Sequence, residues 1–215
     1  QGNGRRADET RQPAHHLSSC GLREYGAVTP TPFHPTHALQ CHPATPPGLP
    51  LDVSVAVGWT AEGLQLVYAI AGDITALRVP AATRPGPADG LWQHTCLEAF
   101  VSAKGDAGYR EFNFSPSGQW AAYRFAGERL RDTATAPDQP APAIQLAVTP
   151  TLLTLDVHLP LDALPSPAPH LALALCAVIE EHDGRLSYWA LQHPQARPDF
   201  HHPAGRALRL ALPVN

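Results

Sequence analysis

The sequence predicts an all-β fold, an antiparallel β-sandwich of about ten strands with an immunoglobulin-like or jelly-roll arrangement. Three observations lead to this prediction. Short runs in which apolar and polar residues alternate recur along the chain from residue 51 to residue 212. Prolines end many of these runs, and β-branched or aromatic residues fill several of them. The best helical candidate, the stretch that follows Pro160, is broken by prolines.

The predicted strands follow one another at a regular spacing, as in other two-layered β-proteins. In chain order they are LDVSVAVGW (51–59), LQLVYAIAG (64–72), TCLEAFVSA (95–103), YREFNF (109–114), QWAAYRF (119–125), IQLAVTP (144–150), LLTLDVHLP (152–160), LALALCAVIE (171–180), SYWALQ (187–192) and RALRLAL (206–212). We therefore expect residues 38–215 to form one β-sandwich domain. Residues 1–37 are rich in Pro, Gly, Thr, His and charge without a sustained period, which predicts a flexible, disordered N-terminal extension.

Composition and charge narrow the classes of partner. The formal net charge is −4, and the 15 Lys and Arg residues form no run longer than Arg5-Arg6, so binding to nucleic acid or to an anionic membrane has little electrostatic support. The longest apolar run, LALALCAVI (171–179), is far shorter than the roughly 18 residues of a membrane span. We expect a soluble protein, in the cytoplasm because no apolar signal segment is visible. The chain contains 0 Met, so its natural N-terminus stays open, as does its oligomeric state.

The hairpin YREFNF-SPSG-QWAAYRF is the most strongly patterned part of the chain. Pro at the second and Gly at the fourth position of the loop predict a type I turn. That turn would pair Phe114 with Gln119 and Asn113 with Trp120. Side chains that are paired across two strands share a face of the sheet. The predicted mixed face carries Tyr109, Glu111, Asn113, Trp120, Ala122 and Arg124, and the predicted core face carries Phe112, Phe114, Ala121, Tyr123 and Phe125.

The preceding strand, 95–103, extends this mixed face. A hairpin loop over 104–107 places Glu98 beside Asn113, sends Leu97, Ala99 and Val101 to the core, and leaves Phe100 on the mixed face. Flat aromatic rings together with carboxylate, amide and guanidinium groups are the side chains that recognise sugars. The hairpin therefore predicts a ligand-binding face for a small-molecule carbohydrate.

Two other kinds of site were considered on the same residues. Ser115 and Ser117 lack a Gly-x-Ser-x-Gly context and an assigned base, so we read them as turn residues. Glu98 and Glu111 could form the carboxylate pair of a weak glycoside hydrolase, which stays open as an alternative. No catalytic residue is otherwise expected, and we predict that the chain is not an enzyme.

Metal and thiol chemistry receive little support from the residue pattern. The 12 histidines include no His-x-Glu-x-His or His-Glu-x-x-His spacing, so no transition-metal site is predicted. A structural calcium ion held by loop carbonyl groups and Asp side chains would leave no trace in the sequence. The cysteines, at positions 20, 41, 96 and 176, lie far apart, which favours buried free thiols over disulfides.

Four blocks of the chain resemble bacterial DOMON-like proteins related to family 9 carbohydrate-binding modules. They are CHPATPPGLPLDVSVAV, ADGLWQHTCLEAFVS, YREFNFSPSGQWAAYRF and SYWALQHPQARPDFHHPAGRALRLAL, and together they extend over roughly residues 39–212. The resemblance implies an antiparallel β-sandwich and a non-catalytic module in which aromatic residues hold a sugar, often at a chain end.

The same resemblance implies roles for individual residues. Trp92 would correspond to a stacking tryptophan and Glu98 to a hydroxyl-binding glutamate, with Arg124 and Trp189 as further matches. With the hairpin analysis, the predicted ligand-binding set is Trp92, Glu98, Asn113, Trp120, Arg124 and Trp189. No cofactor is expected. The wider DOMON group includes haem-binding domains that usually use Met with His or Lys as axial ligands, so haem or redox-cofactor binding is a further alternative. The chain has 0 Met, which removes that ligand set and leaves a bis-His site open.

Overall fold

The structure of the protein is a computed structural model that describes residues 1–2, 35–133, 140–165 and 169–212. The chain divides into two units, Gln1–Pro32 and Phe33–Asn215. Only residues 1–2 of the first unit are described, so the predicted flexible extension lies almost entirely outside the described residues and stays a prediction. The first strand begins at Thr36, two residues before the predicted start of the domain.

The described residues form strands and short 3-10 helices, and no α-helix is found among them. The strands are β1 (Thr36–Cys41), β2 (Leu51–Trp59), β3 (Gly63–Gly72), β4 (Gly86–Pro87), β5 (Cys96–Ala103), β6 (Tyr109–Phe114), β7 (Gln119–Gly127), β8 (Leu130–Arg131), β9 (Ala143–Val148), β10 (Leu152–Pro160), β11 (His170–Glu180), β12 (Leu186–Ala190) and β13 (Leu208–Ala211). The 3-10 helices are η1 (Ile74–Ala76), η2 (Leu91–Gln93), η3 (Leu161–Ala163) and η4 (Pro203–Gly205). The all-β prediction is confirmed, and no described helix is long and apolar enough to cross a membrane.

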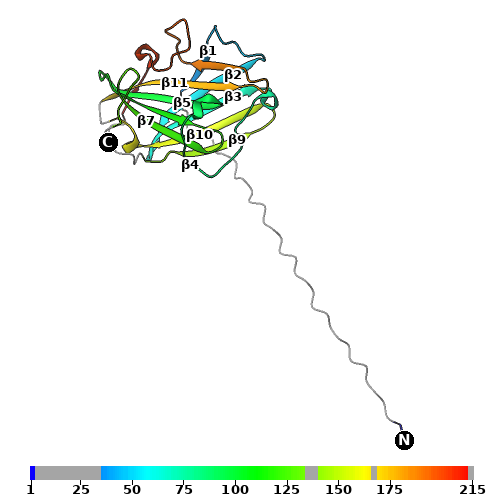
Figure 1. The fold of residues 1–215 in the computed structure, drawn as a ribbon. Coiled ribbons are helices and arrows are strands. Elements are labelled where there is room, and N and C mark those ends of the chain that lie inside the picture. Colours follow the sequence, from blue (N-terminus) through cyan, green and yellow to red (C-terminus); the bar gives the residue numbers. More distant parts are fainter. Residues whose placement is uncertain (3–34, 134–139, 166–168, 213–215) are drawn as a thin grey trace. The chain divides into compact units, whose positions relative to one another are not determined.

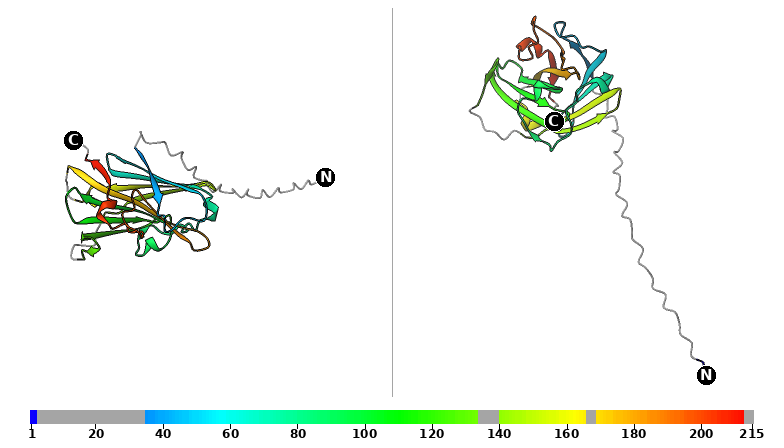
Figure 2. Two further views of the ribbon diagram at one scale, coloured as in Figure 1. Left: turned by 90° about the horizontal axis from the view of Figure 1, so that it is seen from above. Right: turned by 45° about the vertical axis from the view of Figure 1, so that its right-hand side comes forward.

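The strands belong to one continuous mixed sheet with the order β4-β7-β6-β5-β11-β12-β1-β2-β3-β10-β9, while β13 pairs with β11 and β8 with β7. Its pairs are antiparallel apart from β4 and β7, which run parallel. Strand β1 joins the two halves, because Gln40 and Cys41 pair with β12 whereas Thr36–Leu39 pair with β2. Figures 1 and 2 show the sheet curling so that its halves lie over one another. The two predicted layers are therefore the halves of one curled mixed sheet, not two separate antiparallel sheets.

The main core lies between the two halves. Alternate residues of β2, β3 and β10 face it from one half, and alternate residues of β5, β6 and β11 face it from the other. The half that contains β5, β6, β7, β11 and β12 also has a second face, directed away from this core. Phe100, Tyr109, Ala174, Cys176 and Ala190 form a smaller apolar cluster on that second face.

The β6–β7 register differs by one residue from the predicted register. Phe114 pairs with Trp120, and Asn113 pairs with Ala121. The loop between the two strands has three residues, not the predicted four, because the Ser115 N–H donates to the Gln119 carbonyl at 2.9 Å. Gly118 adopts a φ of 88°, which completes a three-residue loop of the kind that ends in a left-handed glycine.

A one-residue shift exchanges the faces of every side chain in the second strand. Tyr123 and Phe125 therefore share a face with Glu111, and Trp120 and Arg124 lie on the face of Phe112 and Phe114. The prediction that Trp120 and Arg124 belong to the mixed face is wrong for this reason. The β5–β6 register was predicted correctly, since Glu98 pairs with Asn113.

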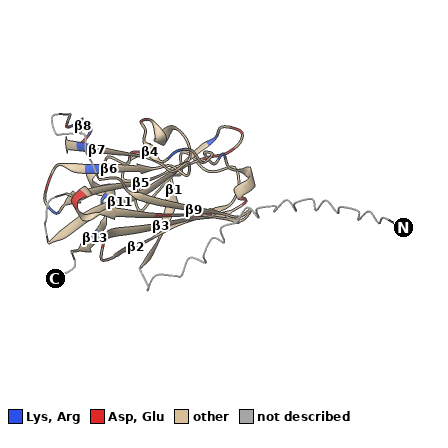
Figure 3. Cartoon of the chain, turned by 90° about the horizontal axis from the view of Figure 1, so that it is seen from below, with Lys and Arg blue, Asp and Glu red and all other residues tan. Residues whose placement is uncertain are grey.

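Arginines mark the outer end of this half of the sheet. Arg110, Arg124 and Arg131 lie on the neighbouring strands β6, β7 and β8 (Figure 3). Arg110 donates to backbone carbonyls of η3, at Asp162 and Ala163, and so ties β6 to the segment that follows β10. The described arginines that approach the second face are Arg129 of the β7–β8 turn, Arg131 of β8 and Arg206, whose guanidinium lies 4.7 Å from the centre of the Tyr109 ring.

Candidate functional site

A cavity of about 700 Å³ lies on the second face of the sheet. We call it the sheet-face cavity. Its floor comes from β5, β6, β11 and β12, and its walls come from η2, β7, the β7–β8 turn and the segment 198–201. The described residues that line it are Asp89, Gly90, Trp92, Gln93, Glu98, Phe100, Glu111, Tyr123, Phe125, Arg129, Arg131, Val178, Tyr188, Pro198, Asp199, Phe200 and His201.

Aromatic rings form the walls of the sheet-face cavity. Trp92 projects from η2, which follows Gly90 in a left-handed conformation (φ 72°), and the residue is 49% exposed. Opposite strands hold the other rings in place: Phe125 stacks on Tyr109 at 4.7 Å, and the Tyr123 hydroxyl donates to Asp89 Oδ1 at 2.7 Å. Flat rings around a cavity of this size provide apolar faces for a ligand ring.

Two buried carboxyl groups lie at the floor, on neighbouring strands. Glu98 pairs with Asn113 and Glu111 pairs with Phe100, so the two glutamates are diagonal neighbours on one face. Their exposed fractions are 3% and 6%. Glu111 Oε1 accepts a hydrogen bond from Asn113 Nδ2 at 2.8 Å. Glu98 Oε1 has no hydrogen-bond partner among the described residues.

Burial sets the protonation of these two groups. It raises the pKa of Glu98 well above its ordinary value, and the nearby Glu111 raises it further. Burial also raises the pKa of Glu111, although the hydrogen bond from Asn113 and the positive charges of Arg131 and Arg129 lower it. Glu98 is therefore the group of the pair that holds a proton more strongly.

A histidine contributes to the same floor from the segment 198–201. The Tyr109 hydroxyl accepts from the Arg129 N–H at 3.2 Å and lies 2.7 Å from His201 Nδ1. When the hydroxyl donates to Nδ1, the imidazole proton is on Nε2, which lies 3.8 Å from Glu111 Oε2. Burial, with the positive charge of Arg129 next, lowers the pKa of His201 to about 4, so His201 is neutral at neutral pH.

The predicted ligand-binding residues separate into two groups. Trp92 and Glu98 line the sheet-face cavity, and Asn113 lies directly under it, fully buried, where it holds Glu111. Trp120 and Arg124 lie on the opposite face of β7 and do not line it. Trp189 belongs to the main core at 6% exposure, and its indole N–H donates to Ser187 Oγ at 2.9 Å. A ligand-binding role stays a prediction for all six residues.

Several lining residues were missed by the sequence analysis. Tyr123 and Phe125 were assigned to the core, and a three-residue loop ending at Gly118 would have placed them correctly. Tyr188 precedes Trp189 in a strand, so alternation puts one of the two on each face. Phe200 and His201 come from an irregular segment, which carries no period from which their place could be predicted.

The described part of the chain shows where potential metal ligands and thiol groups lie. The described residues contain no group of three or more His, Cys, Asp or Glu side chains that could hold a metal ion. A calcium ion bound mainly by carbonyl groups stays a prediction. Cys41, Cys96 and Cys176 are free thiols, and Cys20 lies outside the described residues.

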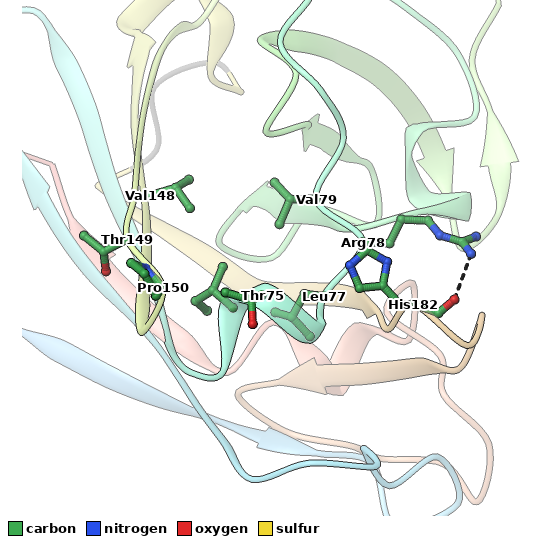
Figure 4. Close-up of a pocket in the computed structure, with 9 residues that line it drawn as sticks. Thr75, Leu77, Arg78, Val79, Val148, Thr149, Pro150 and His182 are labelled. Carbon is green, nitrogen blue, oxygen red and sulfur yellow. Dashed lines mark hydrogen bonds between the residues drawn. The ribbon is translucent and has the colours of Figure 1, made fainter.

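A second, smaller cavity of about 350 Å³ lies between η1, the β9–β10 turn and His182 (Figure 4). Its described lining is mostly apolar, and it includes Ile74, Leu77, Val79 and Val148. Arg78 lies at its rim and donates to the His182 carbonyl at 3.0 Å. Neither an acidic side chain nor a predicted site residue is among the described residues that line it, so the sheet-face cavity is the stronger candidate.

Comparison with known proteins supports the fold assignment. No family model and no curated protein matches the chain. The chain shares its fold with carbohydrate-binding modules. A candidate carbohydrate-binding protein from Bacteroides uniformis matches with a TM-score of 0.60 and 20% identity, over 80% of this chain and 83% of that chain. A family 9 carbohydrate-binding module from Caldicellulosiruptor kristjanssonii, solved in complex with cellotriose, matches with a TM-score of 0.52 and 9% identity, over 74% and 72%.

These likenesses concern the fold. They support the predicted relation to family 9 modules at that level, whereas the relation to DOMON-like proteins stays a prediction.

Proposed function

We propose that the chain is a non-catalytic module that binds a small carbohydrate, or the end of a sugar chain, in the sheet-face cavity. The observation that carries this proposal is the joint presence of a half-exposed Trp92 and a buried, partly unpartnered Glu98 in one cavity. The fold supports it, because a structure of the same fold was solved with cellotriose.

The physical basis is the double nature of a sugar. Its C–H faces are apolar and can stack on the Trp92 ring. Its hydroxyl groups both donate and accept, so they can satisfy the free Glu98 oxygen that is otherwise buried without a partner. A volume of about 700 Å³ also falls within the range typical of small-molecule sites.

The test compares two tryptophans of the same predicted set. Isothermal titration of glucose and cellobiose is carried out with the wild type, Trp92→Ala and Trp120→Ala. Because Trp92 lines the cavity and Trp120 lies on the opposite face of β7, Trp92→Ala should weaken binding by at least tenfold, about 1.4 kcal/mol, and Trp120→Ala should leave it unchanged. Circular dichroism checks that both variants fold. Silence of the wild type across a broad sugar panel, or equal losses in both variants, would contradict the proposal.

Haem binding, the predicted alternative from another class, finds a poor fit in this cavity. The bis-His haem site that is left open in the absence of Met needs two histidine ligands. His201 is the one histidine among the described lining residues, and its Nδ1 is bound to Tyr109. The residues present therefore do not fit the group, and the absence of a Soret band after haem addition would agree with this.

Glycoside hydrolysis stays an alternative on one observation, that Glu98 and Glu111 line the same cavity. Such a mechanism needs an ionised carboxylate beside a protonated one. Glu98→Gln and Glu111→Gln should each abolish any turnover of aryl glycosides if this pair is catalytic. Turnover that persists in either variant would remove the pair from consideration.

A further inference from the structure

The sheet-face cavity has an excess of acidic groups. Its described lining includes four carboxyl groups, Asp89, Glu98, Glu111 and Asp199, but only two arginines. Asp199 is paired with Arg129 at 2.7 Å, at the rim. Arg131 lies over the Tyr123 ring at 4.2 Å, close to the position where the Tyr123 hydroxyl bonds Asp89. At the floor, Glu98 and Glu111 form no ion pair with an arginine or lysine among the described residues, although the charges of Arg131 and Arg129 lower the pKa of Glu111.

The groups that face Glu98 from the surrounding strands are all neutral at neutral pH. They are Cys96 on its own strand, Cys176 on β11, Tyr188 on β12 and, through its bond to the Glu98 carbonyl, Tyr68 on β3. On β6, Asn113 lies opposite Glu98, and Glu111 is the diagonal neighbour. His201 faces Glu111 at 3.8 Å and is neutral. Without a ligand, a proton on one of the two carboxyl groups relieves the repulsion between them.

Aromatic side chains enclose this acidic floor. Trp92, Tyr123, Phe125, Tyr188 and Phe200 all line the same cavity. The faces of such rings attract cations, and the attraction grows when the site is shielded from water. A buried carboxyl pair surrounded by rings is complementary to a ligand that brings its own positive charge.

We infer that the sugar bound here carries a protonated amino group, which lies at the floor between Glu98 and Glu111. The ligand class is thus an amino sugar with a free ammonium group. This inference rests on the proposed function. The proton displaced from the pair passes to solvent, so binding is accompanied by proton release.

The experiment compares three sugars that share one ring. Glucosamine carries an ammonium group, N-acetylglucosamine carries a neutral amide at the same carbon, and glucose carries a hydroxyl. In isothermal titrations, glucosamine should bind at least tenfold more tightly than the other two, about 1.4 kcal/mol. Titrations in buffers of different ionisation enthalpy should show proton release for glucosamine alone, and added salt should weaken only the glucosamine complex.

The controls locate the charge recognition. The double variant Glu98→Gln/Glu111→Gln keeps the shape of the floor and should abolish the preference for glucosamine over glucose, while Glu62→Gln, at the exposed β2–β3 turn, should preserve it. Glucose or N-acetylglucosamine binding as tightly as glucosamine would overturn this inference and leave the proposed function intact. A preference that persists in the double variant, or arises without proton release, would also overturn it. If none of the three sugars binds, both this inference and the proposed function fail.

Discussion

Single residues at the cavity floor differ in how well their polar atoms are satisfied. Asn113 uses its amide N–H to hold Glu111, whereas its own Oδ1 and the Glu98 Oε1 have no hydrogen-bond partner among the described residues. Buried polar atoms without a partner are costly, by about 1–3 kcal/mol each. Two of the four buried side-chain atoms without a partner among the described residues lie at this floor; the other two, Gln65 Oε1 and His158 Nδ1, lie on β3 and β10. At the floor Glu98 lines a cavity, so a ligand can satisfy its free oxygen.

The raised pKa of Glu98 makes a prediction about stability that does not depend on any ligand. In the unfolded chain a Glu titrates near pH 4.3. Because the folded pKa is higher, the stability from the bound proton is fully present below about pH 4.3 and is lost as the pH rises through the folded value. Urea unfolding of the wild type and of Glu98→Gln should therefore show that the wild-type free energy of unfolding, minus that of the variant, falls with rising pH.

The subtraction isolates Glu98 together with its electrostatic coupling to Glu111. His201 also titrates, with a folded pKa of about 4 that lies below the unfolded value, so it adds a slope of the opposite sign, but this slope is common to both proteins. A difference that stays constant with pH would show that folding does not raise the pKa of Glu98.

The elements could largely be predicted from the sequence. Each of the ten predicted strands coincides with an observed strand, because alternation over five or more residues is a strong signal. The strands that were missed are β1, β4 and β8. Strands β4 and β8 have two residues each, too few to show a period, and β1 continues directly from a segment without a pattern.

The register of the β6–β7 turn could not be predicted from the sequence. The residues Ser-Pro-Ser-Gly fit both a four-residue loop and a three-residue loop, and the two choices send opposite faces of β7 into the cavity. The hydrogen bond from the Ser115 N–H to the Gln119 carbonyl fixes the register, and it depends on the conformation of Gly118. The identity of the aromatic wall therefore depended on one torsion angle.

The glycine in this turn can be tested directly. Gly118 has a φ of 88°, and a Cβ there would meet only the Pro85 side chain, at 3.7 Å, so there is space but the backbone is unsuited to other residues. Gly118→Ala should lower the free energy of unfolding by about 1–2 kcal/mol in urea. Gly127→Ala is the matched control: its Cβ would meet nothing within 4 Å, and its φ is not positive. Equal effects in the two variants would show that the turn does not need the left-handed conformation.

At the scale of the whole β-sheet unit, the cavity depends on parts that lie far apart in the sequence. Strand β1 holds the two halves of the sheet together, and the half that bears the cavity has both faces covered: one by the main core, the other by the smaller apolar cluster. His201 reaches the floor through its contact with Tyr109, and Asp199 is held at the rim by Arg129. These long-range contacts carry no periodic signal, which is why the sequence indicated Trp92 and Glu98 but not the side of the cavity opposite to them.

The central claim is that a sugar binds against Trp92 on the second face of the sheet. The chain has 4 tryptophans, whose indole N–H signals can be followed separately by nitrogen-15 NMR and assigned with single Trp→Phe variants. Two of them are hydrogen-bonded internally, Trp59 to the Ala211 carbonyl and Trp189 to Ser187 Oγ, and Trp120 lies on the other face of β7. Titration with glucose, cellobiose and glucosamine should shift the Trp92 signal and leave the other indole signals in place. A Trp92 signal that does not move with any of the sugars, or a shift at Trp120 in its stead, would contradict the claim.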